Sequence, residues 1–91
     1  MLETINKTDN AILKFWAPWC VPCKQTDPII KEFSDKQSKY TVIPVNIDDY
    51  PDIANKYSIR SVPTVIQANF GEVVNAAGGL ELIKKLLKTL N

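Results

Sequence analysis

Apolar residues along this chain form short, nearly continuous runs, of which Ala11–Trp16 is the clearest. A run of this kind, interrupted only by Lys14, is typical of a strand in a sheet that helices cover on both faces. The same reading predicts three more strands, at Tyr40–Ile47, Thr64–Ala68 and Glu72–Ala76. The pattern therefore predicts a sheet of about four strands.

The segments between and after these runs carry apolar residues at helical spacing. Leu80–Leu90 places leucine and isoleucine on one stripe and lysine off it, which predicts an amphipathic helix. The other predicted helices run from Cys20 to about Gln37 and from Pro51 to about Tyr57. Proline suits the first turn of a helix, so Pro51 agrees with the start of the second one. Alternating strands and helices predict a single α/β domain over residues 1–91, with Asn69–Gly71 joining the last two strands as an antiparallel pair.

Composition limits the classes of partner. The 91 residues include 11 basic and 10 acidic side chains, so the net charge is +1 and no strong field favours nucleic acid or an anionic membrane. No apolar run approaches the length that spans a bilayer. The first ten residues are polar and lack the apolar core of a signal peptide, which predicts a cytoplasmic location.

The chain has two cysteines, Cys20 and Cys23, and no histidine. Without histidine, neither a Cys–His nucleophile pair nor a mixed Cys/His zinc site can form. Two cysteines are also too few for a four-ligand structural zinc or an iron–sulfur cluster within one chain. We therefore predict no metal and no bound cofactor, and a metal site shared between two chains is the alternative that this count leaves open.

Cys20 and Cys23 are separated by two residues and follow the first predicted strand directly, where the first long helix begins. The unpaired N–H groups and the positive dipole end of a helix favour thiolate over thiol at the first cysteine. A thiolate attacks a disulfide sulfur to form a mixed disulfide, which a second thiol one turn further along can resolve. We predict Cys20 as the exposed nucleophile and Cys23 as the shielded resolving residue. A structural disulfide, or half of a metal site, is the alternative.

Four separated parts of the sequence together resemble the thioredoxin family. They are Phe15–Lys24, Val45–Asp48 with Pro51–Ala54, Tyr57–Thr64, and Phe70–Glu72 with Gly78–Gly79. The match runs in order from about Ala11 to Leu90. The resemblance implies the thioredoxin fold, with a mixed sheet flanked by helices on both faces. It also implies a protein disulfide reductase that exchanges its dithiol with substrate disulfides.

The resemblance further implies a substrate contact surface around the two cysteines. Its members are Trp19, Pro22, Val62, Pro63 and Gly78. The peptide bond between Val62 and Pro63 would be cis and face the cysteines, leaving the backbone of Val62 free to pair with an extended substrate. The implied partners are protein disulfide substrates and a thioredoxin reductase as electron donor, with the chain acting as a monomer.

Three residues depart from the family's pattern. Lys14 stands where the family usually carries a buried aspartate behind the cysteines, and Pro44 stands where many members carry the lysine that pairs with it. Lys14 is therefore a candidate modulator of thiol acidity. A charged Lys14 would stabilise thiolates, a neutral one could accept a proton from Cys23, and an ammonium that reaches water would touch neither sulfur. Val21 replaces the usual glycine and stiffens the turn, which leaves the reduction potential open, although the cytoplasmic context favours a reductant.

Ten residues precede the first strand, too few for a complete strand, crossover helix and turn. We therefore expect the family's N-terminal strand–helix unit to be truncated, with a short piece around Leu2–Ile5. Pro44 agrees with this, because proline inside a strand is tolerated mainly at a sheet edge. Loss of the first strand would leave Tyr40–Ile47 at that edge.

Two other functions fit parts of the sequence. A glutaredoxin-like reductase would take electrons from glutathione, which suits the small size, although Trp19–Cys23 fits it less well than a Cys-Pro-Tyr-Cys motif would. A binding module with this fold would use the apolar patch around the cysteines for docking. The presence of both cysteines argues against that second alternative.

Overall fold

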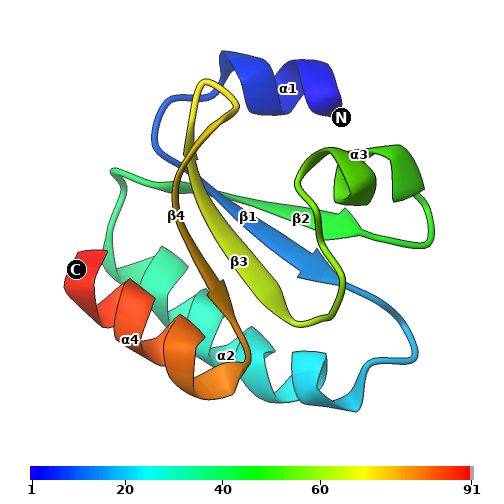
Figure 1. The fold of residues 1–91 in the computed structure, drawn as a ribbon. Coiled ribbons are helices and arrows are strands. Elements are labelled where there is room, and N and C mark those ends of the chain that lie inside the picture. Colours follow the sequence, from blue (N-terminus) through cyan, green and yellow to red (C-terminus); the bar gives the residue numbers. More distant parts are fainter. Residues whose placement is uncertain (91) are drawn as a thin grey trace.

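The computed structural model describes residues 1–90 and places a four-stranded sheet between two layers of helices (Figure 1). In chain order the elements are α1 (Leu2–Lys7), β1 (Ala11–Trp16), α2 (Val21–Lys36), β2 (Thr41–Asn46), α3 (Pro51–Lys56), β3 (Thr64–Asn69), β4 (Glu72–Gly78) and α4 (Leu80–Leu90). The strand order is β2-β1-β3-β4, in which β1 runs parallel to β2 and antiparallel to β3, and β3 and β4 are antiparallel. The predicted mixed α/β sheet is confirmed, including its terminal antiparallel pair.

Two apolar cores, one on each face of the sheet, join it to the helices. On one face, Ile53 of α3 belongs to the same buried cluster as Phe15 of β1, and α1 covers the same face. On the other face, Phe33 of α2 and Ile83 of α4 cluster with Ile12 of β1. Alternate residues of a strand point to opposite faces. Because both faces of β1 are covered, nearly all of its residues are apolar.

Most predicted boundaries agree with the structure within a residue or two. The predicted strand Glu72–Ala76 is too short, because Ala77 and Gly78 continue β4 and pair with Val65 and Thr64 of β3. The predicted helix start at Cys20 shifts by one position, since Cys20 is the cap and the helix begins at the next residue.

The segment before β1 forms the helix α1, and β2 lies at the edge of the sheet, as Pro44 predicted. The N–H groups of Thr41 and Ile47 donate to the carbonyls of Asn10 and Trp16, at 3.0 and 2.9 Å. Backbone groups of successive residues in a strand point to opposite sides. The odd-numbered residues of β2 therefore face β1, and Pro44 faces the open edge, so its missing N–H costs the sheet no hydrogen bond.

Phe70 and Gly71 form the turn between β3 and β4, and both have positive φ, 50° and 85°. Positive φ at both central residues is the pattern of a type I′ turn, whose twist matches that of the flanking strands. Asn69, predicted as part of this connection, belongs to β3 instead. The turn is also tied to other parts of the chain. The N–H of Phe70 donates to the carbonyl of Thr8 at 2.9 Å, and the hydroxyl of Tyr57 donates to the carbonyl of Gly71 at 2.8 Å.

Tyr57→Phe is expected to lower the free energy of unfolding at neutral pH by about 1 kcal/mol, the typical net value of one hydrogen bond. Desolvation raises the pKa of Tyr57 above its ordinary value of 10.0, so the folded protein ionises this hydroxyl less readily than the unfolded chain. The wild type therefore loses stability as the pH rises past that ordinary value and through the raised one. The variant lacks this group. Urea unfolding should therefore show that the difference in the free energy of unfolding between wild type and Tyr57→Phe becomes smaller at alkaline pH.

Tyr50→Phe is the matched control, because the hydroxyl of Tyr50 makes no hydrogen bond to another group within residues 1–90. It should change the free energy of unfolding by less than Tyr57→Phe at neutral pH. A difference between wild type and Tyr57→Phe that stayed constant across the alkaline range would contradict the prediction.

Candidate active site

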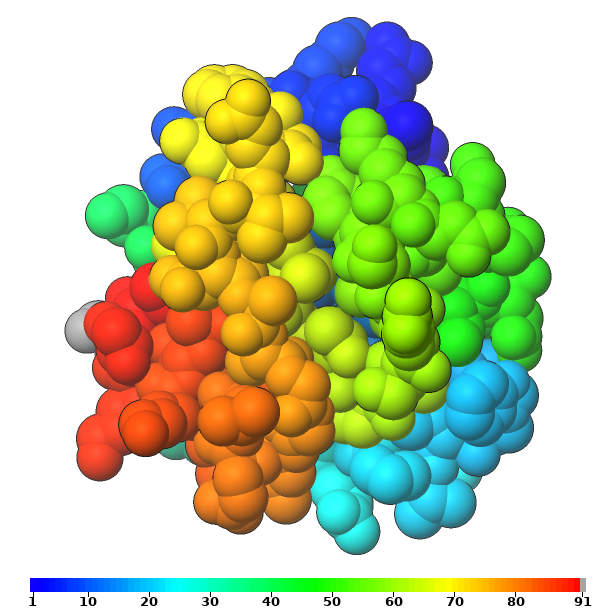
Figure 2. Space-filling model, in the orientation of Figure 1, coloured from blue at the N-terminus to red at the C-terminus, as the bar shows by residue number. Residues whose placement is uncertain are grey.

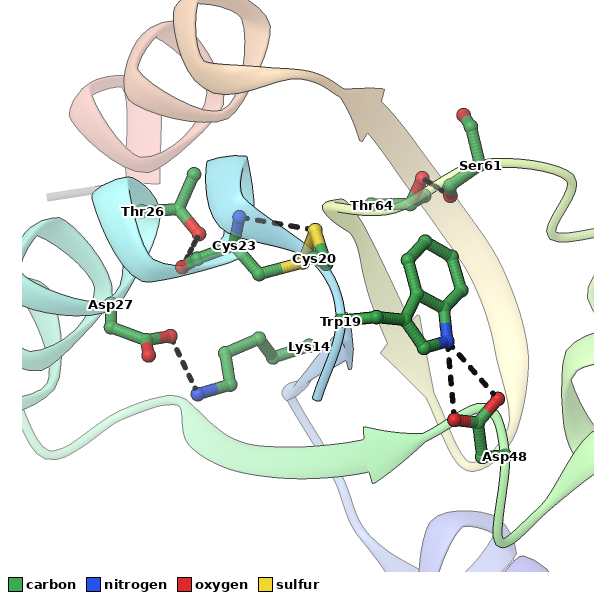
Figure 3. Close-up of a disulfide and its surroundings, with 9 residues drawn as sticks. All are labelled: Lys14, Trp19, Cys20, Cys23, Thr26, Asp27, Asp48, Ser61 and Thr64. Carbon is green, nitrogen blue, oxygen red and sulfur yellow. Dashed lines mark hydrogen bonds and ion pairs between the residues drawn. A yellow bond between two sulfur atoms is a disulfide. The ribbon is translucent and has the colours of Figure 1, made fainter. Parts of the chain in front are cut away.

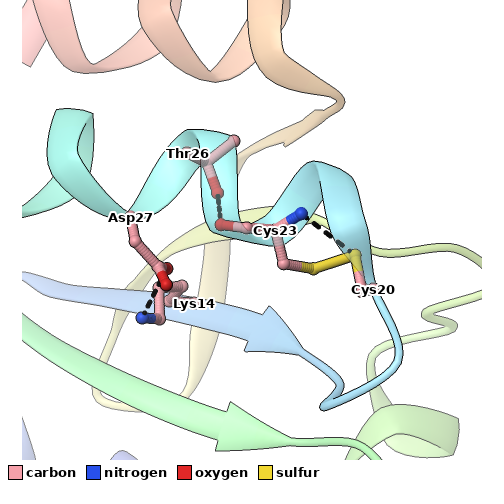
Figure 4. Close-up of polar contacts among 5 residues, drawn as sticks. All are labelled: Lys14, Cys20, Cys23, Thr26 and Asp27. Atoms are coloured by element: carbon pink, nitrogen blue, oxygen red, sulfur yellow. Dashed lines mark hydrogen bonds and ion pairs between the residues drawn. A yellow bond between two sulfur atoms is a disulfide. The ribbon is translucent and has the colours of Figure 1, made fainter.

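Cys20 caps the N-terminus of α2, and Cys23 lies one turn into the helix. The backbone of Cys20 is extended, and its Sγ accepts a hydrogen bond of 3.1 Å from the N–H of Cys23 (Figure 4). The two sulfurs are joined in a disulfide, with their Cα atoms 5.3 Å apart. Pro22 suits the first turn, where its missing N–H has no helical partner to lose. The local sequence thus begins a helix and brings two sulfurs to bonding distance at its start.

The prediction that Cys20 is exposed is wrong for the disulfide form, because both cysteines are only 3% exposed. They form a small apolar cluster with Ala17, and Val62 packs against it. The exposed surface at this place belongs to the neighbouring side chains Trp19 and Val21, each 65% exposed. A molecule that approaches the disulfide therefore meets two large apolar side chains beside it.

A carboxylate that was not predicted from the sequence holds the side chain of Trp19. The indole Nε1–H of Trp19 donates to Asp48, at 3.2 Å from Oδ2 and 3.5 Å from Oδ1 (Figure 3). Asp48 follows β2 and Trp19 follows β1, and these strands are parallel neighbours. Because the carboxyl ends of parallel strands meet at the same edge of a sheet, the sequence did hold a signal for this contact. The bond gives a mostly exposed indole a preferred direction.

The Val62–Pro63 peptide bond is cis, as the resemblance implied, and Val62 lies against the cysteine cluster. Figure 2 shows the yellow-green segment around residue 60 beside the light-blue segment around residue 20. Gly78 lies beside this turn, because it pairs with Thr64 and the next residue, Gly79, donates its N–H to the carbonyl of Pro63 at 3.0 Å. Within residues 1–90, no hydrogen bond uses the backbone N–H or carbonyl of Val62.

Lys14 pairs with Asp27, a residue that was not predicted to belong to the site. The Nζ of Lys14 lies 3.0 Å from Oδ1 of Asp27, and the two side chains are 20% and 51% exposed. Asp27 follows Cys23 by four residues on α2, a spacing that places two helix residues on one face and is readable from the sequence. The ammonium of Lys14 ends on this partly exposed carboxylate (Figure 3).

The chemistry available here is that of the two sulfurs. Among residues 1–90, no three His, Cys, Asp or Glu side chains come close enough together to hold a metal ion. No helix in this part of the chain has both the length and the apolar character needed to cross a membrane. An α/β fold that carries a disulfide at a helix N-terminus, beside exposed apolar side chains, defines a thiol–disulfide oxidoreductase.

Comparisons with known proteins place the chain within this class. The thioredoxin family model matches residues 2–91. A thioredoxin from Rickettsia bellii is 43% identical, over 98% of this chain and 87% of its own length. A thioredoxin from Pyropia yezoensis is 39% identical, over 98% of this chain and 84% of its own length. The structure of a mutant thioredoxin from Halobacterium salinarum is similar with a TM-score of 0.80 at 27% identity, covering 97% of this chain and 80% of that one. The chain belongs to the thioredoxin family.

Proposed function

We propose that this chain reduces disulfide bonds in other proteins, with Cys20 as the attacking sulfur and Cys23 as the resolving sulfur. As a thioredoxin-family member with both cysteines in place, it is a thiol–disulfide oxidoreductase. The assignment of these roles rests on the hydrogen bond from the N–H of Cys23 to Cys20 Sγ, which lies at the positive end of α2. Once the disulfide opens, this N–H and the helix dipole stabilise negative charge on the sulfur of Cys20.

The reaction transfers two electrons to the substrate in two steps. The thiolate of Cys20 attacks one substrate sulfur, so that a Cys20–substrate bond forms, the substrate disulfide breaks, and one substrate thiolate leaves and takes a proton from water. Cys23 then loses its proton and attacks Cys20 Sγ, which restores the intramolecular disulfide and releases the second substrate sulfur as a thiolate. The disulfide in the structure corresponds to the chain after this second step. We propose a thioredoxin reductase as the donor that returns it to the dithiol.

An extended segment of the substrate is proposed to lie across Trp19, Pro22 and Val62. The N–H and carbonyl of Val62 have no partner within residues 1–90, so they are available to a substrate backbone. Main-chain bonds of this kind do not depend on the substrate's side chains, which suits a reductase of many proteins. Pro63 is buried behind Val62, and Gly78, which has no side chain, allows a second backbone to come close.

We also propose that the chain acts as a monomer in the cytoplasm. All the residues proposed for the site come from a single chain, so no second subunit is needed to complete it. A reductant must be returned to its dithiol form, and the cytoplasm is the compartment where thiols are kept reduced. Sedimentation of the purified protein and fractionation of its source cells test the two statements.

The test of the function is reduction of insulin disulfides with two alternative electron donors. We expect turnover with NADPH and a bacterial thioredoxin reductase, and little turnover with glutathione and glutathione reductase. The reverse result would identify a glutaredoxin-like enzyme. A folded chain that is inactive with both donors and with dithiothreitol would overturn the proposal. In cells that lack thioredoxin, a Cys20→Ser, Cys23→Ser double variant that still complemented growth would favour a binding module instead.

A further inference from the structure

Lys14 is the only charged residue in β1, β2 and β3. Its side chain lies on the face of the sheet covered by α2, because Ile12, two residues earlier in β1, belongs to the cluster on that face. A charge on a covered sheet face is costly unless a group of opposite sign meets it. The group that meets it is the carboxylate of Asp27, at 3.0 Å.

The position of Asp27 is also fixed relative to Cys23. Helix residues that are four apart have Cβ atoms about 5–6 Å from each other, so Asp27 lies one turn of α2 beyond the resolving cysteine. Figures 3 and 4 view the pair from different sides, and in both the ammonium of Lys14 is turned toward Asp27 and away from the disulfide. A positive and a negative charge therefore lie together, one helical turn from Cys23.

The other charged groups near this pair lie on α2 and are exposed, as Asp27 is. They are Lys24, next to Cys23, and the Lys31–Asp35 pair further along the helix, and none of them is changed when Lys14 or Asp27 is replaced. Pro44 of β2 and Val65 of β3, which flank Lys14 in register, are uncharged. Lys84 and Lys88 of α4 line a groove of about 160 Å³ at Ile29 and Phe33, further along α2 than Asp27. The effects of Lys14 and Asp27 on Cys23 can therefore be separated by substitution.

We infer that Asp27 is a positioning residue for the redox reaction, which holds the ammonium of Lys14 away from Cys23 and offsets its charge. The inference rests on the proposed role of Cys23 as the resolving sulfur. With both charges present, their effects on the thiol of Cys23 largely cancel. Without Asp27, an unopposed ammonium stabilises the thiolate, and without Lys14, an unopposed carboxylate destabilises it. The pair thereby sets how readily Cys23 loses its proton before it attacks Cys20.

The test compares wild type, Asp27→Asn, Lys14→Met and the double variant. The reduction potential of each protein is measured across the pH range, because its slope against pH changes at the pKa of each thiol. The pH at which the slope changes is called the break for that thiol. The Coulomb interaction with one unit charge a helical turn away should move the break for Cys23 by about one pH unit, to lower pH in Asp27→Asn and to higher pH in Lys14→Met. The double variant is expected to return close to the wild type.

Two further variants separate this effect from damage to the helix. Asp27→Glu keeps the charge and should retain the wild-type break. Asp35→Asn breaks an exposed ion pair on the same helix, several turns from Cys23, and should not move the break. The inference is overturned if neither single variant moves the break, or if both move it in the same direction. If the cysteines form no reversible disulfide, the proposed function fails as well, and insulin turnover by the same wild-type sample identifies that case.

Discussion

Cys23→Ser is expected to stop the reaction halfway and to accumulate a covalent complex with the substrate. Cys20 still attacks the substrate disulfide, but no thiol remains one turn along α2 to release the second substrate sulfur. Turnover should fall to a single event, with one substrate molecule retained on each chain. Mass spectrometry of the variant after incubation with a disulfide-containing protein, before and after dithiothreitol, measures both the complex and its redox lability.

Cys20→Ser is the matched control, since it removes the other sulfur from the same helix start. It should show neither turnover nor a covalent complex under the same conditions. A complex that formed on Cys23 in this variant, at the rate seen on Cys20 in Cys23→Ser, would exchange the two assigned roles. The difference between the variants therefore reports which sulfur attacks, independently of how much either substitution changes stability.

Phe15→Ala is expected to lower the free energy of unfolding by about 3–5 kcal/mol, the usual cost of removing a buried aromatic ring. Phe15 is fully buried, and its ring centroid lies 6.0 Å from that of Tyr57. A small domain has a total stability of about 5–15 kcal/mol, so this loss is a large share of it. Urea denaturation should show an earlier midpoint, and the melting temperature should fall by about 4–8 °C for each kcal/mol lost.

Phe70→Ala provides the comparison, because Phe70 is an exposed aromatic ring at the tip of the β3–β4 hairpin. Its loss should change the free energy of unfolding by about 0.5 kcal/mol or less, as is usual for surface positions. Equal losses in the two variants would mean that the cluster around Phe15 contributes no more than an exposed turn. That result would contradict the arrangement of the core.

The elements that could be predicted most closely are those with a strong period of their own. Ala11–Trp16 was identified by its nearly unbroken apolar run, and Leu80–Leu90 by its helical stripe, and both have the predicted bounds. The helix Leu2–Lys7 has only six residues, too few for a period to distinguish helix from strand. The C-terminal end of β4 was missed because alanine and glycine favour strands weakly, and pairing with β3 decides their conformation.

The site was predicted as far as its local sequence determines it. The Cys20–Cys23 pair needs only the spacing of two residues at a helix start, and the structure joins the two sulfurs. Strand order and helical spacing place Asp48 and Asp27 near the site, but their partners, Trp19 and Lys14, are decided only when strands and helices pack together. The low exposure of Cys20 has the same origin, since the residues that cover it come from a separate loop and from the turn before α2.

The outward-facing position of Pro44 makes the two edges of the sheet unequal. A strand that paired with β2 along this edge would meet the carbonyl of Pro44 as an acceptor but no N–H donor at that residue. The backbone pairing would therefore lack one hydrogen bond near the middle of β2. This holds whether the added strand comes from another copy, from a different protein or from further chain attached to Met1. Extension of the sheet on that side must therefore bulge past the proline or stop short of it, whereas β4 offers an edge without proline.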